Sequence, residues 1–252
     1  MNKPVANTSI PNPNLLTEEI EEIGFSLVGN NLNPMMLSYE FLTSSGIVPR
    51  NWELAKQPAT NQRMSQIAFQ NGVSIVAQPG VVNFVEGVNG RKLKELLSPN
   101  VILEYITKLP HAEYQRLNTT PKMIVPFGEG NPDSARKFIT EVLLNEGSWK
   151  EFGQAPVQAS LNLSYQLEQT IFNLTINEAK IQLPNKVSLA GLLFAGNFTY
   201  NLPEDNDDDI KLDKLKTYLN LWQENMTTFR QVVKQKFLQT ASNSQESLFS
   251  SL

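Results

Sequence analysis

The feature of this chain that most restricts its fold is an alternation of apolar and polar residues between Val157 and Leu167. Every odd position in this stretch is apolar. The even positions hold Gln158, Ser160, Asn162, Ser164 and Gln166. A period of two indicates a β-strand that buries one face and exposes the other. The exposed face of this strand carries amides and hydroxyls and no charged side chain.

The stretch 171–183 predicts a second strand that returns antiparallel to the first. Keeping the apolar residues on one face pairs Leu167 with Phe172, Tyr165 with Leu174, and Leu163 with Ile176. Beyond Asn177 and Glu178 the apolar residues move from even to odd positions. One extra residue restores the apolar face, so we predict a β-bulge at these two positions.

In this register the polar side chains of the two strands face one another. The expected cross-strand pairs are Gln166 with Asn173, Ser164 with Thr175, and Asn162 with Asn177. A solvated face is the simplest interpretation, because antiparallel sheets commonly leave one face to water. The alternative is a recognition surface, since neutral polar groups are desolvated at lower cost than charges. We therefore take these residues as candidate partner-binding residues.

Residues 16–127 predict a first sheet-plus-helix half. Asn71-Gly72 is the dipeptide that best fits a type I′ hairpin, and it separates two short apolar stretches. Pro79-Gly80 fits a second tight turn, because proline presets one turn angle and glycine accepts a positive φ. The sequence thus predicts three antiparallel strands. They are expected at 67–70, 73–76 and 82–86.

Helices are expected to cover these strands. One begins at Asn33-Pro34 and ends at Gly46, and another begins at Ser98-Pro99 and ends before Pro110, because proline is favoured in a first helical turn and blocks continuation. Ahead of them, Thr17 is expected to cap a short acidic helical turn. A strand is expected at 25–28.

Residues 128–239 predict a second half of the same kind. A helix is expected after Asn131-Pro132, followed by the alternating hairpin and a third strand at 193–202. The last element is a long helix that begins at Asp208 or Asp209 and reaches Gln239. Its apolar residues recur at near-heptad spacing. They are Leu215, Leu219, Trp222, Met226, Phe229, Val233 and Phe237.

These elements predict an α+β fold with two antiparallel halves of three or more strands each, and with the C-terminal helix packed across both. The halves suggest a distant internal duplication, although no repeat is visible residue by residue. The segments 1–15 and 240–252 are rich in polar residues and proline or serine, and we expect both to be disordered.

Charge and cysteine content restrict the possible functions. The net charge is −4 and the pI about 5.2, which argues against a nucleic-acid-binding protein, because such proteins carry a basic patch. The chain has no cysteine, so thiol catalysis, disulfides and cysteine-ligated metals are excluded. No stretch resembles a signal peptide or a membrane span. These features predict a cytoplasmic protein without a membrane association.

Motifs for catalysis, metals and cofactors are absent or incomplete. His111 is the only histidine, and its place after Pro110 predicts a surface turn and not a catalytic base. The run Asp205–Asp209 lacks the glycine and the glutamate of a calcium loop, so we expect it to cap the last helix. The loop Gly128–Pro132 lacks the lysine of a phosphate-binding loop. We expect no catalytic residue, no metal and no cofactor.

Four strings in the chain resemble a conserved protein family of cyanobacteria that carries no assigned activity. They are WEL at Trp52–Leu54, FQNGVSI at Phe69–Ile75, VPF at Val125–Phe127 and APVQASLNLSYQLE at Ala155–Glu168. The resemblance covers most of the chain between about residues 25 and 239. It implies a bacterial, cytoplasmic protein and assigns no role to any residue.

Two functions follow from these observations. The first is a non-enzymatic protein-binding or assembly protein, acting through a protein partner or through self-association at the neutral polar face. The second is a small-molecule-binding protein or metal-independent enzyme with a pocket between sheet and helices. A large pocket with converging carboxylates or His111 favours the second function. An exposed surface with an apolar groove favours the first.

Overall fold

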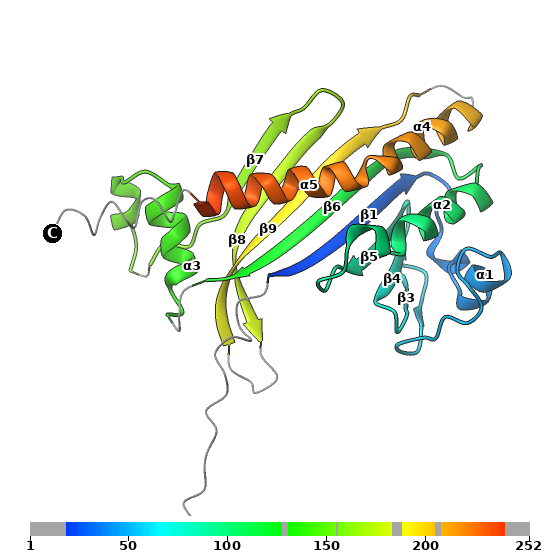
Figure 1. The fold of residues 1–252 in the computed structure, drawn as a ribbon, viewed down its shortest axis with the longest axis horizontal. Helices are drawn as coiled ribbons and strands as arrows, with labels where there is room; N and C mark the ends of the chain where they lie inside the picture. Colours follow the sequence, from blue (N-terminus) through cyan, green and yellow to red (C-terminus); the bar gives the residue numbers. More distant parts are fainter. Residues whose placement is uncertain (1–18, 128–130, 155, 183–187, 205–207, 240–252) are drawn as a thin grey trace, which may run out of the picture.

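The computed structural model describes residues 19–127, 131–154, 156–182, 188–204 and 208–239, and its strands form one antiparallel sheet (Figure 1). The nine strands lie in the order β2-β3-β4-β5-β1-β6-β9-β8-β7. Their bounds are β1 (Ile20–Gly29), β2 (Ala59–Thr60), β3 (Ser65–Ala68), β4 (Val73–Gln78), β5 (Val81–Gly87), β6 (Tyr114–Pro126), β7 (Leu161–Gln166), β8 (Ile171–Gln182) and β9 (Ser188–Asn201). The predicted α+β class with an antiparallel sheet is confirmed. The segments 1–15 and 240–252, which we expect to be disordered, lie outside the described residues.

Helices pack against one face of the sheet, and α2, α4 and α5 run across it in Figure 1. The α-helices are α1 (Tyr39–Ser44), α2 (Ser98–Lys108), α3 (Ser134–Lys137), α4 (Asp208–Asn220) and α5 (Trp222–Gln231). Shorter helical segments are η2 (Pro34–Met36), η3 (Leu93–Glu95), η4 (Phe138–Leu143), η5 (Ser148–Glu151) and η6 (Val232–Leu238). On the opposite face, every described side chain of the paired strands other than glycine remains partly or fully exposed. We call this surface the open face.

The core lies between the sheet and the helices, because each strand alternates buried and accessible side chains. Its largest buried side chains are phenylalanines from both ends of the sheet and from α5. They are Phe25, Phe84, Phe172, Phe194, Phe198 and Phe229. The strands of both predicted halves therefore contribute to one continuous core, and the two halves meet where β6 pairs with β9.

The C-terminal helix confirms the near-heptad prediction. It consists of α4, α5 and η6, with a single turn at Leu221 between the first two. The predicted stripe from Leu215 to Val233 is buried, and Phe237 packs against the core. Ring contacts link it to the sheet, with centroids 6.3 Å apart for Trp222 and Phe25. The long helix thus covers the sheet with its apolar side.

The first strand corrects the predicted acidic turn. Glu21 and Glu22 belong to β1 and not to a helix, and β1 extends from Ile20 to Gly29. The acidic residues are accommodated because each has a cation beside it: Glu21 binds Arg230 of α5, and Glu22 binds Lys122 of β6 at 2.8 Å. These partners are distant in sequence, so a local pattern does not reveal them.

Two predicted turns have different outcomes. Gly80 has a φ of 77°, as the predicted turn at Pro79-Gly80 requires. The type I′ turn at Asn71-Gly72 is wrong, because Gly72 has a positive φ of 92° and Asn71 does not. Instead the Gly72 N–H donates to the Phe69 carbonyl, and Phe69 closes the hairpin by donating to the Val73 carbonyl. Gln70 and Asn71 are therefore the central residues of the turn, and Gly72 is its last residue and not a central one.

The helix predicted from Asn33 to Gly46 divides in two. Asn33 caps η2 by accepting a hydrogen bond from the Met35 N–H at 2.9 Å. Ser38 then caps α1 by accepting from the Phe41 N–H at 3.0 Å. The second cap lies inside the predicted helix because serine competes with helical backbone bonding. Gly46 ends the segment with a φ of 76°, as predicted.

Candidate functional site

The predicted hairpin exists, but its register is wrong by two positions. The observed pairs are Leu161 with Ile176, Leu163 with Leu174, and Tyr165 with Phe172. The cause is a tighter turn than we predicted: the Leu167 N–H donates to the Thr170 carbonyl at 2.9 Å, so Glu168 and Gln169 form the loop. A shift of two preserves which side chains share a face. The predicted division into apolar and polar faces therefore survives the wrong register.

The predicted bulge at Asn177 and Glu178 is also wrong. β8 pairs with β9 without interruption there, with Asn177 opposite Leu193 and Glu178 opposite Leu192. The apolar residues beyond this point consequently change faces. Ile181 lies on the open face, and its Cδ1 is 3.3 Å from the position that a Cβ at Gly191 would take. It lies opposite Leu189, so this end of the open face is apolar.

All of the candidate partner-binding residues lie on the open face of β7 and β8. They are Asn162, Ser164, Gln166, Asn173, Thr175 and Asn177. Thr175 Oγ1 donates to Asn162 Oδ1 at 2.8 Å, and Ser164 lies opposite Asn173. Gln166 lies opposite Ile171, and its Nε2 donates to the Leu167 carbonyl. Asn177 lies beyond the paired part of β7, where it faces Leu193 of β9.

The neutral polar face continues far beyond the predicted hairpin. Asn83, Ser26, Asn118 and Thr199 lie opposite one another across β5, β1, β6 and β9. We call these four residues the central row. Asn197 lies opposite Asn173 and joins this surface to the hairpin. The polar face of β9 was predictable from the sequence, because Asn197 and Thr199 alternate with Phe198 and Tyr200. The order of the strands, which joins this face to the others, was not.

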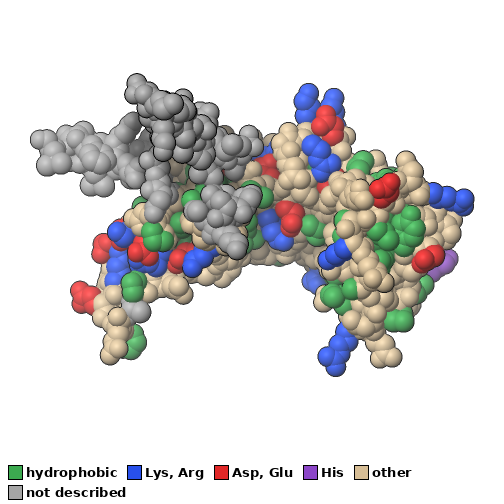
Figure 2. All heavy atoms as spheres, turned by 90° about the horizontal axis from the view of Figure 1, so that it is seen from below, with side chains coloured by type: hydrophobic (Ala, Val, Ile, Leu, Met, Phe, Trp, Pro, Cys, Tyr) green, Lys and Arg blue, Asp and Glu red, His purple; other side chains and the backbone are tan. Residues whose placement is uncertain are grey.

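Charge is sparse on the open face. Among the described residues of the paired strands, its charged side chains are Glu22, Lys122 and Arg116. Lys122 Nζ lies 2.8 Å from Glu22 Oε1, so two of these charges neutralise each other. On the side seen in Figure 2, Lys and Arg side chains lie among Asp and Glu side chains, and the outline is hollowed between two lobes.

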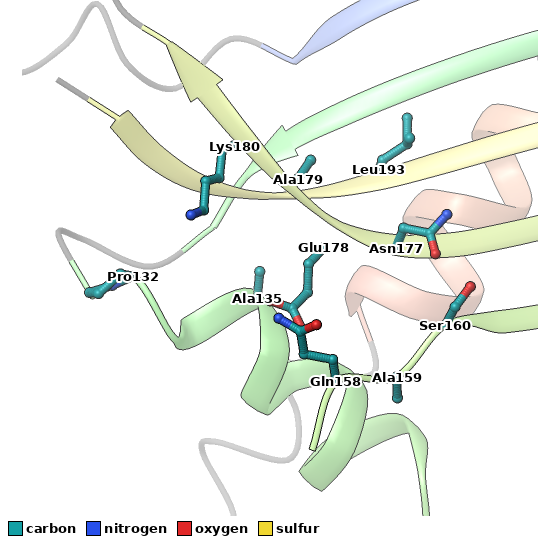
Figure 3. Close-up of a pocket in the computed structure, with 10 residues that line it drawn as sticks. All are labelled: Pro132, Ala135, Gln158, Ala159, Ser160, Asn177, Glu178, Ala179, Lys180 and Leu193. Atoms are coloured by element: carbon teal, nitrogen blue, oxygen red, sulfur yellow. The ribbon is translucent and has the colours of Figure 1, made fainter. Parts of the chain in front are cut away.

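A pocket of about 600 Å³ lies where α3 approaches β8 and β9 (Figure 3). Its polar lining comes from Gln158, Ser160, Asn177, Glu178 and Lys180. Figure 3 shows Glu178 and Gln158 pointing toward one another. Lys180 lies on β8 with Glu178 and points to the same side of that strand. The pocket thus combines amides, a carboxylate and an ammonium group, which suits a polar ligand.

A second hollow of about 760 Å³ lies at the other end of the sheet and contains His111. His111 Nδ1 is 2.8 Å from Asp208 Oδ2, and the histidine side chain is 82% exposed. Nearby, Glu113 accepts hydrogen bonds from the side-chain amides of Asn30 and Asn31. The predicted surface position of His111 is confirmed.

The acidic run also has its predicted place in part. Asp208 and Asp209 lie in the first turn of α4, where carboxylates favour the helix dipole. The preceding residues 205–207 lie outside the described part of the chain. Within the described part, no group of three or more His, Asp or Glu side chains is arranged to hold a metal ion.

The perturbed tyrosines belong to the core side of the molecule. Burial raises the pKa of Tyr105 to about 12, and burial together with the neighbouring Tyr105 raises the pKa of Tyr114 further. Burial also raises the pKa of Tyr200, whose hydroxyl donates to Asn225 Oδ1 at 2.9 Å. These phenols therefore stay protonated at neutral pH.

Comparisons with known proteins add no family. No protein-family model matches this sequence, and a search of curated proteins found no significant match. The likeness to a cyanobacterial family thus remains a prediction. Among the described residues, no helix combines the length and the apolar composition that crossing a lipid bilayer requires.

Proposed function

We propose that this chain is a non-enzymatic protein-binding or assembly protein of the bacterial cytoplasm, and that it binds its partner with the open face. The observation that carries the proposal is the central row of Asn83, Ser26, Asn118 and Thr199, which continues into the hairpin. Amides and hydroxyls offer donors and acceptors at a lower desolvation cost than charges. Such groups suit an interface that must exclude water over a wide area.

The size of the open face favours a macromolecular partner. Neighbouring strands lie about 4.8 Å apart, so nine strands span roughly 40 Å. A standard protein interface buries about 800 Å² on each partner, which a surface of this width provides. The apolar end around Ile181 and Leu189 would supply the dehydrated part of such an interface.

Charge favours a protein partner over a nucleic acid. A nucleic-acid surface needs many unpaired cations, because phosphate neutralisation supplies much of its affinity. On the described part of the open face, Arg116 is the cation that remains after Lys122 pairs with Glu22. The net charge of −4 would add repulsion.

The order of the elements supports an internal duplication in which each half supplies part of the open face. From β1 the chain passes through α1, β2–β5 and α2, and from β6 it passes through α3, β7–β9 and the C-terminal helix. In each part the first strand pairs with the last, β1 with β5 and β6 with β9. This division falls before β6, ahead of the predicted boundary at residue 127. We therefore propose that the parts before and after it are related halves, and that one partner contacts both.

A capture experiment tests this function. Tagged full-length protein is used to isolate partners from the native cells, alongside a Thr175→Arg variant with a charge on the open face. A Gln223→Arg variant places the same charge on the exposed side of α5 and is the control. We expect one partner to be captured by wild type and by Gln223→Arg and to be lost with Thr175→Arg. Equal capture by all three folded proteins would contradict the proposal.

A small-molecule-binding function is the second candidate, favoured by the pocket in Figure 3. Its Glu178 and Lys180 present opposite charges to one cavity beside neutral amides. A polar metabolite that binds there would raise the melting temperature of wild type and not that of a Glu178→Gln, Lys180→Gln double variant. If a metabolite stabilises the protein in this way and no protein partner is captured, the second function replaces the first.

A further inference from the structure

The outer edge of β7 presents backbone groups that have no partner strand among the described residues. β7 is the last strand of the sheet and pairs with β8 alone. The bond from the Leu167 N–H to the Thr170 carbonyl fixes the alternation along the hairpin. In an antiparallel pair every second residue bonds to the neighbouring strand and the others face away. The N–H and C=O groups that face away belong to Asn162, Ser164 and Gln166.

This edge lacks the features that normally prevent strands of different chains from pairing. Proteins protect edge strands with charges, proline, bulges or very short strands. Leu161–Gln166 contains no charged residue and no proline, and its register with β8 is regular. The opposite edge of the sheet is protected by its length, by proline and by charge. Its strand β2 has 2 residues and follows Pro58, and Lys56 donates a hydrogen bond to the side chain of Gln66 in β3.

We propose that β7 pairs with β7 of a second copy of this chain, antiparallel about a twofold axis at Ser164, so that the two sheets become continuous. Ser164 then faces its own counterpart and Asn162 faces Gln166, on the open side. Leu163 faces Tyr165 on the helix side. The inference rests on the assembly role proposed above, but it uses the strand edge and not the open face.

The side chains of β7 make this register self-complementary. All of them are neutral, so no like charges meet across the twofold axis, where they would be destabilising. Tyr165 is 37% exposed, and Leu163 of the second copy would cover it. Each outward-facing residue would donate and accept one backbone hydrogen bond. A second copy thus satisfies both the backbone and the side chains, as an isologous contact requires.

The contact is expected to be weak. A strand of 6 residues is about 20 Å long, and pairing it buries less than the roughly 1,200 Å² of a stable interface. The dimer should therefore form in proportion to protein concentration. Sedimentation velocity should show a monomer when dilute and a growing dimer fraction at high concentration.

Cysteine cross-linking tests the register directly, because the chain has no native cysteine. In the proposed register Ser164 and its counterpart form a hydrogen-bonded pair, whose Cα atoms lie about 5.5 Å apart, a separation that a disulfide spans. We expect mild oxidation to convert Ser164→Cys into a covalent dimer. Asn173→Cys, on the same face but one strand inward, is the control and should remain monomeric. Equal cross-linking of both variants would indicate contact through the open face and would overturn the edge pairing.

Two further changes distinguish edge pairing from a general loss of folding. Ser164→Pro removes an outward N–H without breaking the bonds to β8, so the dimer should disappear while the melting temperature changes little. Ser164→Lys and Ser164→Glu should each be monomeric and should form a dimer when mixed. A monomeric wild type at every concentration, without cross-linking at 164, overturns the proposal. If the capture experiment then shows that Ser164→Pro loses a partner protein, the β7 edge binds that protein and not a second copy of this chain. Thr175→Arg tests the open face separately.

Discussion

Glu86 shows how one buried residue positions a helix against the sheet. It lies on the core side of β5 and is fully buried. Its Oε2 accepts hydrogen bonds from the Leu97 N–H at 2.9 Å and from the Ser98 N–H at 2.8 Å, at the start of α2. Arg91 Nη1 lies 2.8 Å from its Oε1. The carboxylate therefore supplies the cap that the sequence of α2 itself does not provide.

Replacing Glu86 with glutamine keeps the shape and removes the charge. Because hydrogen bonds to charged groups contribute about 1.5–3 kcal/mol each, we expect Glu86→Gln to lower the free energy of unfolding by about 2 kcal/mol. Urea denaturation measures it. Glu95→Gln is the matched control, since Glu95 is exposed and accepts from the Lys92 N–H, and its effect should stay within about 0.5 kcal/mol. Equal effects of the two changes would contradict the assigned role of Glu86.

Tyr105 gives the stability of the protein an alkaline dependence. The unfolded phenol ionises near its ordinary pKa of 10.0, whereas burial raises the pKa in the folded protein to about 12. Below pH 10 the full stability is present, and it falls as pH rises from 10 to 12 because only the unfolded state releases the proton. Two pKa units correspond to about 3 kcal/mol.

The Tyr105→Phe variant isolates this contribution, because the ring contact with Phe84 at a centroid distance of 5.3 Å needs no hydroxyl. Urea unfolding at pH 9 and at pH 11.5 gives the loss of stability for each protein. We expect the loss to be smaller in Tyr105→Phe than in wild type by about 2 kcal/mol. Identical losses would show that Tyr105 ionises normally in the folded protein.

At the scale of elements, an ion pair links the C-terminal helix to β1. Arg230 Nε and Nη2 bind the two carboxylate oxygens of Glu21 at 2.8 and 2.5 Å. Glu21 is only 13% exposed, so this pair is better shielded than the one between Lys234 and Glu19. Bidentate pairing of this kind is specific to arginine.

Removing this pair should loosen the helix end. We expect Arg230→Met to lower the free energy of unfolding by about 1–2 kcal/mol and to speed amide hydrogen exchange in η6. Lys234→Met is the control, and an exposed pair of its kind should contribute less than about 1 kcal/mol. If Lys234→Met is as destabilising as Arg230→Met, the helix is held by packing and general charge and not by this pair.

The predictability of each element depends on how local its causes are. The alternation at 157–167 and the apolar stripe from Leu215 to Val233 repeat with the strand and helix periods, so the helix and the strand β7 were predictable. The predicted strand is shorter than its pattern, because residues 157–160 lie outside β7. The register of the hairpin was not, because it depends on whether Leu167 bonds to Thr170 or lies opposite Phe172. β1 was partly missed because Glu21 finds its partner in Arg230, far along the chain.

The same reasoning explains what could be predicted of the candidate site. The polar face of β7 and β8 follows from the alternation of apolar and polar residues, and a register shift of two residues leaves each side chain on the same face. Its continuation through Asn118 and Ser26 requires the order of the strands, which arises from pairing between β1 and β6. No local pattern contains that order. The sequence therefore predicted one end of the open face and not its extent.

At the scale of the whole molecule, the two faces of the sheet differ in the side chains they carry. The helix side holds the continuous core, and the open face carries neutral polar side chains from β5 to β7. Pairing through β7 would place two open faces side by side without covering either. The proposed dimer and the proposed partner are thus compatible with each other.

The most direct test is the affinity of the captured partner for a variant in the central row. Asn118→Arg puts a charge between Ser26 and Thr199, which are both partly exposed, so the fold should tolerate it. Calorimetric titration should show a dissociation constant raised at least about tenfold for Asn118→Arg, a change of about 1.4 kcal/mol, and unchanged for Gln223→Arg. Unchanged affinity for a folded Asn118→Arg variant would contradict binding at the open face.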